Sequence, residues 1–262
     1  MNRIAPAPRR QLPAWPFIPL LLGAACAHAA SAAIEVRLMA QESIAPKWIA
    51  HEGASTGLCP DIVAAIEKIE PRLRFSSMGV GRSVPVIEKG LESGAVAAAC
   101  ALLDTPHRRQ IAHIVGKPLY TVRHRLAGVA GEKADINNLA DLIRLNAVVT
   151  TTRGAGYTEQ LRALGLQVDD TSGDVALNLR KVLGGHGRFV YLNELTLGWY
   201  IRAEGLDTKM YLLPAVLKEE PIYFWMSQRA DPAAVALVEH AINSLADSGE
   251  LKNIYQRWSG VH

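Results

Sequence analysis

Residues 97–108 read AAACALLDTPHR, and the interpretation of the whole chain starts from this stretch. Its first half holds only small and apolar side chains, which is typical of a strand that is buried on both faces of a parallel sheet. The apolar run ends at Thr105-Pro106, and the cations Arg108 and Arg109 follow at once. An arginine held just beyond a buried strand is positioned rather than merely solvated, and its planar set of donors matches a carboxylate. The stretch therefore predicts a site for a carboxylate or a similar anion.

The chain begins like a secretory signal peptide. Three arginines within the first ten residues precede a short apolar run, and the small-residue stretch AHAASA follows at residues 27–32. A basic start, a short apolar segment and an A-x-A site are typical of a cleaved signal, and the apolar run is too short for a good membrane span. We expect a signal peptide over residues 1–29, cleaved after Ala29 or, as the second choice, after Ala32. A periplasmic protein is the expected product.

The basic character of the chain belongs to this leader. Its three arginines account for the whole formal net charge of +3, so the mature chain is close to neutral. No stripe of lysine and arginine remains that would indicate nucleic acid or an acidic membrane surface as a partner. About 230 residues remain after cleavage, which is enough for one large domain or for two lobes with cores of their own.

The cysteines fit an oxidising compartment. The mature chain keeps Cys59 and Cys100, and an isolated pair in such a compartment more often forms a bridge than stays free. We expect a Cys59–Cys100 disulfide, and the alternative is two buried thiols that pack as small apolar groups. The third cysteine, Cys26, lies in the leader, and Gly23 stands where a lipoprotein signal needs leucine. A lipoprotein is therefore not expected.

Short apolar strands alternate with amphipathic helices along the mature chain. The pattern predicts strands at residues 34–39, 73–76 and 95–102, with helices at residues 60–69 and 83–92 between them. The same alternation starts again after Arg125, and a long helix from Asp231 to Gly249 follows near the end. This order is typical of parallel sheets covered by helices.

The alternation predicts two α/β lobes. Because the chain returns to the first lobe at its end, two strands are expected to cross between the lobes near residues 120–126 and 211–222. The predicted boundaries are residues 30–124 for the first lobe, 125–215 for the second and 216–262 for the return.

Four short motifs, in this order and spacing, carry a resemblance to a known family. They are GLCPDI at residues 57–62, TPHR at 105–108, GRFV at 187–190, and SGEL at 248–251 with IY at 254–255 and WSG at 258–260. In these motifs the chain resembles extracytoplasmic solute-binding proteins of the amino-acid-binding type, family 3, which are receptors of ABC transporters. The resemblance implies the periplasmic-binding-protein type II fold, two lobes that are each a mostly parallel sheet flanked by helices. It also implies capture of a small carboxylate-bearing solute, an amino acid or a related organic anion, for a membrane permease.

The resemblance also implies where the ligand binds in the first lobe. The arginine of the Thr-Pro-x-Arg motif pairs with the ligand's carboxylate in the family, and Arg108 occupies that position. The residues just before it, Leu103, Asp104 and Thr105, are expected beside the ligand. The alternative is that Arg108 only bridges to a surface acid.

The second lobe is expected to contribute the turn Gly154-Ala155-Gly156. Glycines at a strand-to-helix turn let backbone N–H groups point at an anion. The family often has a hydroxyl residue after its glycine, and Ala155 and Gly156 stand there instead, so that contact is lost. The alternative is an ordinary turn.

Asn193 departs from the resemblance. After a strand like the one expected at residues 189–192, amino-acid binders usually place an aspartate that holds the ligand's ammonium group, and Asn193 offers no charge. Either Glu194 or Asp104 meets the ammonium group, or the ligand is not a standard amino acid, because a buried ammonium group without a countercharge is costly.

Three further residues are candidates for the cleft. Trp48 stands where the family often has an aromatic side chain that stacks on the ligand, and a packing role for the helix near Pro60 is the alternative. Arg82 is a second candidate cation, and Tyr120 is expected near the crossing strands. A purely structural role is the alternative for both.

The sequence contains no motif of a common enzyme class. It has no G-x-S-x-G, no P-loop, no H-E-x-x-H and no Cys/His metal spacing, so we expect no enzyme, no metal and no cofactor. A periplasmic dehydratase on the same fold is the enzymatic alternative, with Glu194, Asp104 or His107 as the general acid. A receptor-kinase sensor is expected to have a transmembrane tail, and the sequence ends at His262 without one. We expect a monomer with a small-molecule ligand and an ABC permease as partners.

Overall fold

The structure of the protein is a computed structural model that describes Met1 and residues 33–51, 54–76 and 81–259. Apart from Met1, the expected signal peptide and both expected cleavage positions lie outside the described residues.

The first α/β unit follows the alternation expected from the sequence. Its elements are β1 (Ile34–Arg37), β2 (Ile49–His51), β3 (Ala54–Thr56), α1 (Leu58–Ile69), β4 (Leu73–Ser76), α2 (Val84–Ser93), β5 (Ala98–Leu103) and α3 (Pro106–Ile111). Strands β1 and β4 pair in parallel, and Leu38, just after β1, forms a parallel bridge to Ala98 of β5. Parallel neighbours need a crossover between them, and α1 and α2 supply it. The end of β5 leads directly into the α3 helix that carries Arg108.

The second unit repeats the alternation. Its elements are α4 (Leu139–Arg144), β7 (Val148–Thr150), α5 (Thr158–Ala163), β8 (Gln167–Asp169), α6 (Val175–Leu183), β9 (Phe189–Asn193) and α7 (Glu194–Ala203). Strand β7 lies between β8 and β9 and pairs in parallel with both. The turn at residues 152–157 and the start of α7 therefore follow neighbouring strands at the same edge of the sheet.

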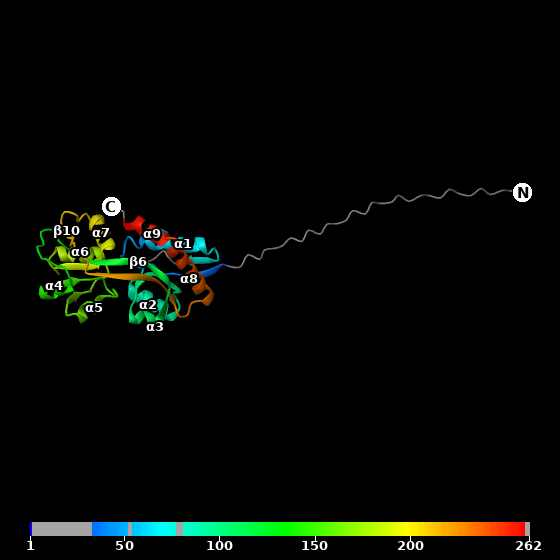
Figure 1. Ribbon diagram of the computed structural model, residues 1–262, viewed down its shortest axis with the longest axis horizontal. Helices are drawn as coiled ribbons and strands as arrows, with labels where there is room; N and C mark the ends of the chain where they lie inside the picture. The colour runs from blue at the N-terminus through cyan, green and yellow to red at the C-terminus, as the bar shows by residue number, and fades with distance from the viewer. Residues whose placement is uncertain (2–32, 52–53, 77–80, 260–262) are drawn as a thin grey trace. The chain divides into compact units, whose positions relative to one another are not determined.

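Two long strands join the units. They are β6 (Ala112–Val129) and β11 (Lys218–Ser227), and the elements around β11 are β10 (Met210–Leu212), α8 (Pro232–Asp247) and α9 (Glu250–Ser259). Strand β6 pairs with β11 along residues 112–124 and with β9 along residues 124–127. Figure 1 shows β6 and β11 running side by side between the helices of the two units. These strands correspond to the expected crossing strands, and the lobe boundaries derived from the sequence stay predictions.

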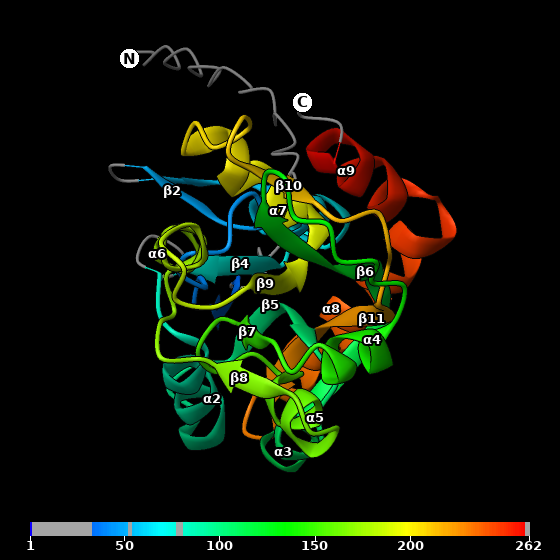
Figure 2. The same ribbon diagram turned by 90° about the vertical axis from the view of Figure 1, so that its left-hand side faces the viewer.

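Within the units, β1 pairs with β4 and β7 pairs with β8 and β9 in parallel, as expected, and the crossing strands add antiparallel pairs. The strand order is β5-β11-β6-β9-β7-β8 with β10 on β6, and β11 is antiparallel to both β5 and β6. The outgoing and returning strands of the crossing run in opposite directions, so only antiparallel pairing is open to them. Helices α8 and α9 both pack against β6, and Figure 2 shows α9 beside this strand.

Contacts between distant motifs tie the first unit together. Cys59 of α1 and Cys100 of β5 form the expected disulfide, with their Cα atoms 6.0 Å apart. Trp258 of α9 donates a hydrogen bond from Nε1 to Oδ2 of Asp61 in α1, over 2.9 Å. Gly57, just before α1, has φ +128°, and a Cβ atom there would lie 2.6 Å from a backbone oxygen. Glycine is therefore required at this position by conformation and by space. Among the described residues, no helix is both long enough and apolar enough to cross a membrane.

Candidate ligand-binding site

A cavity of ≈ 70 Å³ lies where β5 and α3 of the first unit face β6, β9 and the turn at residues 152–157. The structure places many of the predicted ligand residues in its wall. These are Leu103, Arg108, Tyr120, Gly154, Ala155, Gly156 and Asn193. Residues that lie up to 90 positions apart in the sequence thus meet around one space. Ligand contact by each of them stays a prediction.

Four predicted residues do not line this cavity. Trp48 is a buried core residue, and its expected contact with a ligand stays a prediction. Thr105 caps α3, since its side chain accepts a hydrogen bond from the backbone N–H of Arg108 over 3.2 Å. Asp104 accepts a hydrogen bond of 2.7 Å from Nε of the exposed Arg109. The side chain of Arg82 is exposed and donates to the backbone of Gly81.

Arg108 is held from two sides within the protein. Only 3 % of its surface is exposed. Its Nε atom donates to Oε1 of Glu88 over 2.9 Å, and its Nη1 atom donates to the carbonyl of Leu103 over 2.8 Å. The expected alternative, a bridge to an acid, therefore describes one side of the guanidinium only. Its Nη2 atom has no hydrogen-bond partner among the described residues, and Arg108 lines the cavity.

Lys47 is a second cation in the cavity wall, although no motif of the sequence indicated it. Its side chain is buried, and Nζ donates to the carbonyl of Ala101 over 2.9 Å and to the side chain of Gln41. No carboxylate among the described residues pairs with it. Burial, and then the charge of Arg108, lower the pKa of Lys47 to about 7. The available signal was its position in the loop that carries Trp48, which the resemblance had already assigned to the cleft.

Two glycines let the second unit approach Arg108 closely. A Cβ atom on Gly156 would lie 2.9 Å from Cγ2 of Thr105 and 3.1 Å from Nη1 of Arg108. A Cβ atom on Gly154 would lie 2.8 Å from Cδ of Pro85, and Gly154 also has φ +74°. Any side chain at Gly156 would push this turn away from the guanidinium. The turn is therefore shaped to close over Arg108.

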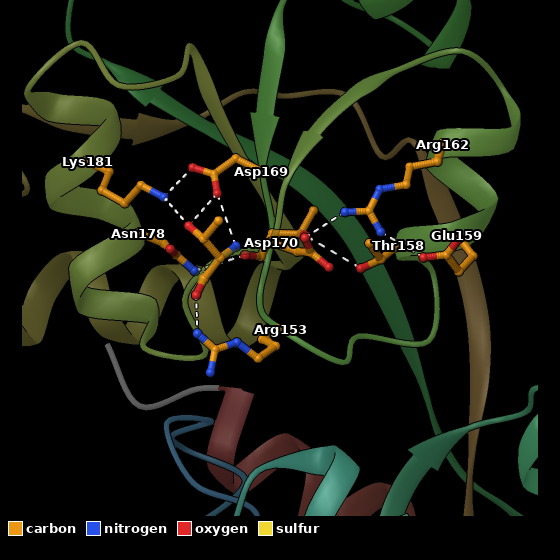
Figure 3. A network of polar contacts seen from close by, with 10 residues as sticks. Arg153, Thr158, Glu159, Arg162, Asp169, Asp170, Asn178 and Lys181 are labelled. Atoms are coloured by element: carbon orange, nitrogen blue, oxygen red, sulfur yellow. Dashed lines mark hydrogen bonds and ion pairs between the residues drawn. The ribbon is translucent and has the colours of Figure 1, made fainter.

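A polar network behind the turn fixes its backbone (Figure 3). Arg153 donates to the carbonyl of Thr171, and Nδ2 of Asn178 donates to the carbonyl of Thr151 over 3.0 Å. An ion pair between Lys181 and Asp169 holds the end of β8 beside them. Arg153 is thus used for anchoring, whereas the residues after it line the cavity.

Asn193 presents donors to the cavity. It caps α7, and its Oδ1 atom accepts a hydrogen bond from the backbone N–H of Thr196 over 2.9 Å. Because the backbone N–H needs an acceptor, this contact determines which way the amide faces, and its NH₂ group remains for other partners.

His124 of β6 is a neutral polar group in the cavity wall. Burial, and then the charge of Lys218, lower its pKa to about 4, so the imidazole carries no charge at neutral pH. Its Nε2 atom lies 3.4 Å from Oε2 of Glu220, but neither ring nitrogen makes a hydrogen bond among the described residues. Buried polar atoms are rarely left without a partner.

None of the described residues that line the cavity is an aspartate or a glutamate. The two acids that the sequence suggested for the ligand's ammonium group lie outside the lining and form ion pairs with arginines. Glu194 pairs with Arg123 and Arg125, and Asp104 pairs with Arg109. His107, the third candidate acid of the dehydratase alternative, is exposed and lies outside the lining. The cavity therefore contains two cations and several neutral polar groups.

Comparisons with known proteins identify the fold of the chain. No family model matches the chain, and no curated protein matches it in sequence. Solved structures match over most of its length. A histidine kinase sensor domain with similarity to periplasmic binding proteins has a TM-score of 0.74 at 17% identity, covering 87% of this chain and 97% of that one. The chain has the α/β fold of type II periplasmic binding proteins.

Two further structures illustrate the range of proteins with this fold. An ancestral arginine-binding protein bound to arginine matches with a TM-score of 0.72 at 16% identity, over 86% of this chain and 98% of that one. The VFT2 domain of BvgS from Bordetella pertussis matches with a TM-score of 0.70 at 17% identity, over 86% and 93%. At these identities the likeness establishes the fold, and the ligand has to be argued from the cavity.

Proposed function

We propose that the protein is an extracytoplasmic binding protein that captures a small carboxylate-bearing solute, an amino acid or a related organic anion. One observation carries the proposal: Arg108 is buried, fixed by Glu88 and Leu103, and lines a cavity with part of its guanidinium unpaired. A carboxylate supplies the acceptors that this group lacks, and a bond between ionised partners is strong where water is excluded.

The proposed mechanism is closure of two α/β units around the solute. The first unit supplies Arg108, and the second supplies the glycine turn that approaches it and the amide of Asn193. Crossing strands such as β6 and β11 provide a place for hinge motion between the units. In this proposal the leader directs the protein to the periplasm, and an ABC permease receives the solute from the closed form.

A ligand-sensing receptor component is the second candidate. It is favoured by the histidine kinase sensor domain among the matched structures. The two roles share the same capture step and differ in the partner that recognises the closed protein. Reconstitution with candidate permeases would separate them, since only a transport receptor stimulates ATP hydrolysis by its permease when the ligand is present. The dehydratase alternative is not favoured, because its candidate acids lie outside the cavity.

Thermal shift with a panel of amino acids, dicarboxylates and oxo acids tests the capture step. A ligand that binds only the folded protein raises its melting temperature. We expect at least one small carboxylate to do so, and we expect Arg108→Met to weaken its binding by at least about 30-fold, as expected for loss of one partner of a buried charge pair. Arg109→Met is the matched control, because Arg109 is exposed and paired with Asp104. Unchanged affinity in Arg108→Met, or no shift with any small carboxylate, would overturn the proposal.

A further inference from the structure

We infer that the cavity selects a small carboxylate without an ammonium group, a 2-oxo or 2-hydroxy acid, and that Lys47 is the second cation that binds it. This inference rests on the proposed function and narrows its ligand.

The first step is the charge balance of the buried groups. The charge of Arg108 is offset by Glu88, whose carboxylate lies 2.9 Å from Nε. The charge of Lys47 has no such offset among the described residues, since its Nζ atom contacts only a carbonyl and an amide oxygen. An isolated buried ammonium group is costly unless an anion joins it. One carboxylate in the cavity, shared by Lys47 and the unpaired side of Arg108, would balance this charge.

The described cavity wall offers no negative charge to a ligand ammonium group. An α-amino acid would bring a cation into a wall that has no aspartate or glutamate among its described residues. Asn193 offers no negative charge to an ammonium group, and its carbonyl oxygen already accepts a hydrogen bond from the Thr196 N–H. An oxo or hydroxyl oxygen at the same carbon would instead accept a hydrogen bond from Asn193 or from the neutral His124.

Binding of a carboxylate should be coupled to proton uptake by Lys47. Because burial and the charge of Arg108 lower the pKa of Lys47 to about 7, a bound carboxylate would favour the charged form and cause proton uptake above that pH. Burial lowers the pKa of His124 to about 4 and raises the pKa of both Tyr120 and Tyr157, so none of these three groups titrates near pH 7. The charged and titratable groups that line the cavity with Lys47 are Arg108 of α3, Tyr120 and His124 of β6 and Tyr157 before α5. Glu88 pairs with Arg108, and Glu220 lies beside His124.

Calorimetric titration with matched acid pairs tests the ligand class. The pairs are pyruvate with alanine and 2-oxoglutarate with glutamate, in which the oxo group and the ammonium group exchange at one carbon. We expect the oxo acid of at least one pair to bind at least tenfold more tightly than its amino acid at pH 6. We also expect its affinity to fall between pH 7 and pH 9, with proton uptake detected as a difference between buffers of unlike ionisation enthalpy.

Variants test the role of Lys47 separately. Lys47→Met is expected to bind the oxo acid at least tenfold more weakly at pH 6 and to lose the pH dependence. Lys117→Met is the control, because Lys117 forms an exposed ion pair with Asp247, and we expect it to behave like the wild type. If Lys47→Met does not fold, Lys47→Gln and the wild-type pH profile give the same two readouts.

The outcomes separate this inference from the proposed function. If amino acids bind through Arg108 as tightly as their oxo partners, the proposed function stands and the inference is wrong. If oxo acids bind with a flat pH profile and with full affinity in the Lys47 variant, the role of Lys47 is wrong. If no carboxylate binds, both fail.

Discussion

Glu88 of α2 accepts a hydrogen bond from Nε of Arg108 over 2.9 Å. This contact joins α2 and α3, the helices that precede and follow β5 in the chain. Arg108 is almost fully buried, whereas the Glu88 side chain keeps 17 % of its surface exposed. The carboxylate thus offsets a charge that cannot reach water.

Glu88→Gln is expected to destabilise the protein without a bound ligand by about 3 kcal/mol, the lower end of the range for breaking a buried pair. The reason is that Arg108 keeps its charge and loses the group that offsets it. Urea denaturation of the variant measures the change. The double variant Glu88→Gln/Arg108→Met should lose less than the sum of the single changes, and additive losses would contradict this account. Asp247→Asn, which breaks an exposed pair, is the control and should change little.

Gly156→Ala is expected to weaken ligand binding about tenfold, equivalent to about 1.4 kcal/mol, while the protein stays folded. Its Cβ atom would lie 2.9 Å from Thr105 and 3.1 Å from Arg108, so the turn must move away from the guanidinium. Calorimetric titration with the tightest carboxylate of the panel measures the loss. Gly173→Ala is the matched control, because no atom lies within 4 Å of a Cβ atom there. Equal affinities of the two variants would show that the close approach is unimportant.

Lys47 should make stability depend on pH. Its pKa is about 7 in the folded protein and 10.5 as the ordinary value, so between these limits the unfolded chain binds a proton that the folded protein does not. Stability therefore rises with pH across this window, by up to about 1.4 kcal/mol per pH unit, and the full penalty is present below pH 7.

The difference between the wild type and Lys47→Met isolates this effect. Without a ligand at pH 6, we expect Lys47→Met to have the larger free energy of unfolding. Between pH 7 and pH 9, we expect the free energy of unfolding of the wild type to rise relative to that of the variant. Urea denaturation at four pH values measures both curves. Parallel curves would contradict a lowered pKa for Lys47.

Replacing both Cys59 and Cys100 with alanine is expected to lower the free energy of unfolding by about 2–4 kcal/mol. The bridge joins α1 to β5 across 41 positions of sequence and restricts the unfolded chain. Denaturation of the variant against the oxidised wild type measures the loss.

Thiol labelling checks the same bridge directly. The denatured, unreduced full-length chain should show one reactive thiol, that of Cys26. Three reactive thiols would exclude the disulfide.

Much of the fold can be predicted from the sequence because its signals are local. The apolar run before Asp104 forms the buried strand β5, and the predicted strand at residues 73–76 has the bounds of β4. Asn138 caps α4, as its side chain accepts a hydrogen bond from the backbone N–H of Asp141. Periodic burial determines such elements within a few residues of chain. The antiparallel pairing of β6 and β11 has no local signal, because it depends on where the chain returns about 100 residues later.

For this protein the sequence alone determined the alternation of strands and helices, the cysteine pair and the place of Arg108 beyond a buried strand. Only the tertiary structure decided which charges meet. It paired Arg108 with Glu88, used the oxygen of Asn193 as a helix cap, and buried Lys47 against a carbonyl 54 positions away. The physical reason is that apolar periodicity records which residues leave water. The fate of each buried charge depends on partners that only the folded chain brings within a few ångströms.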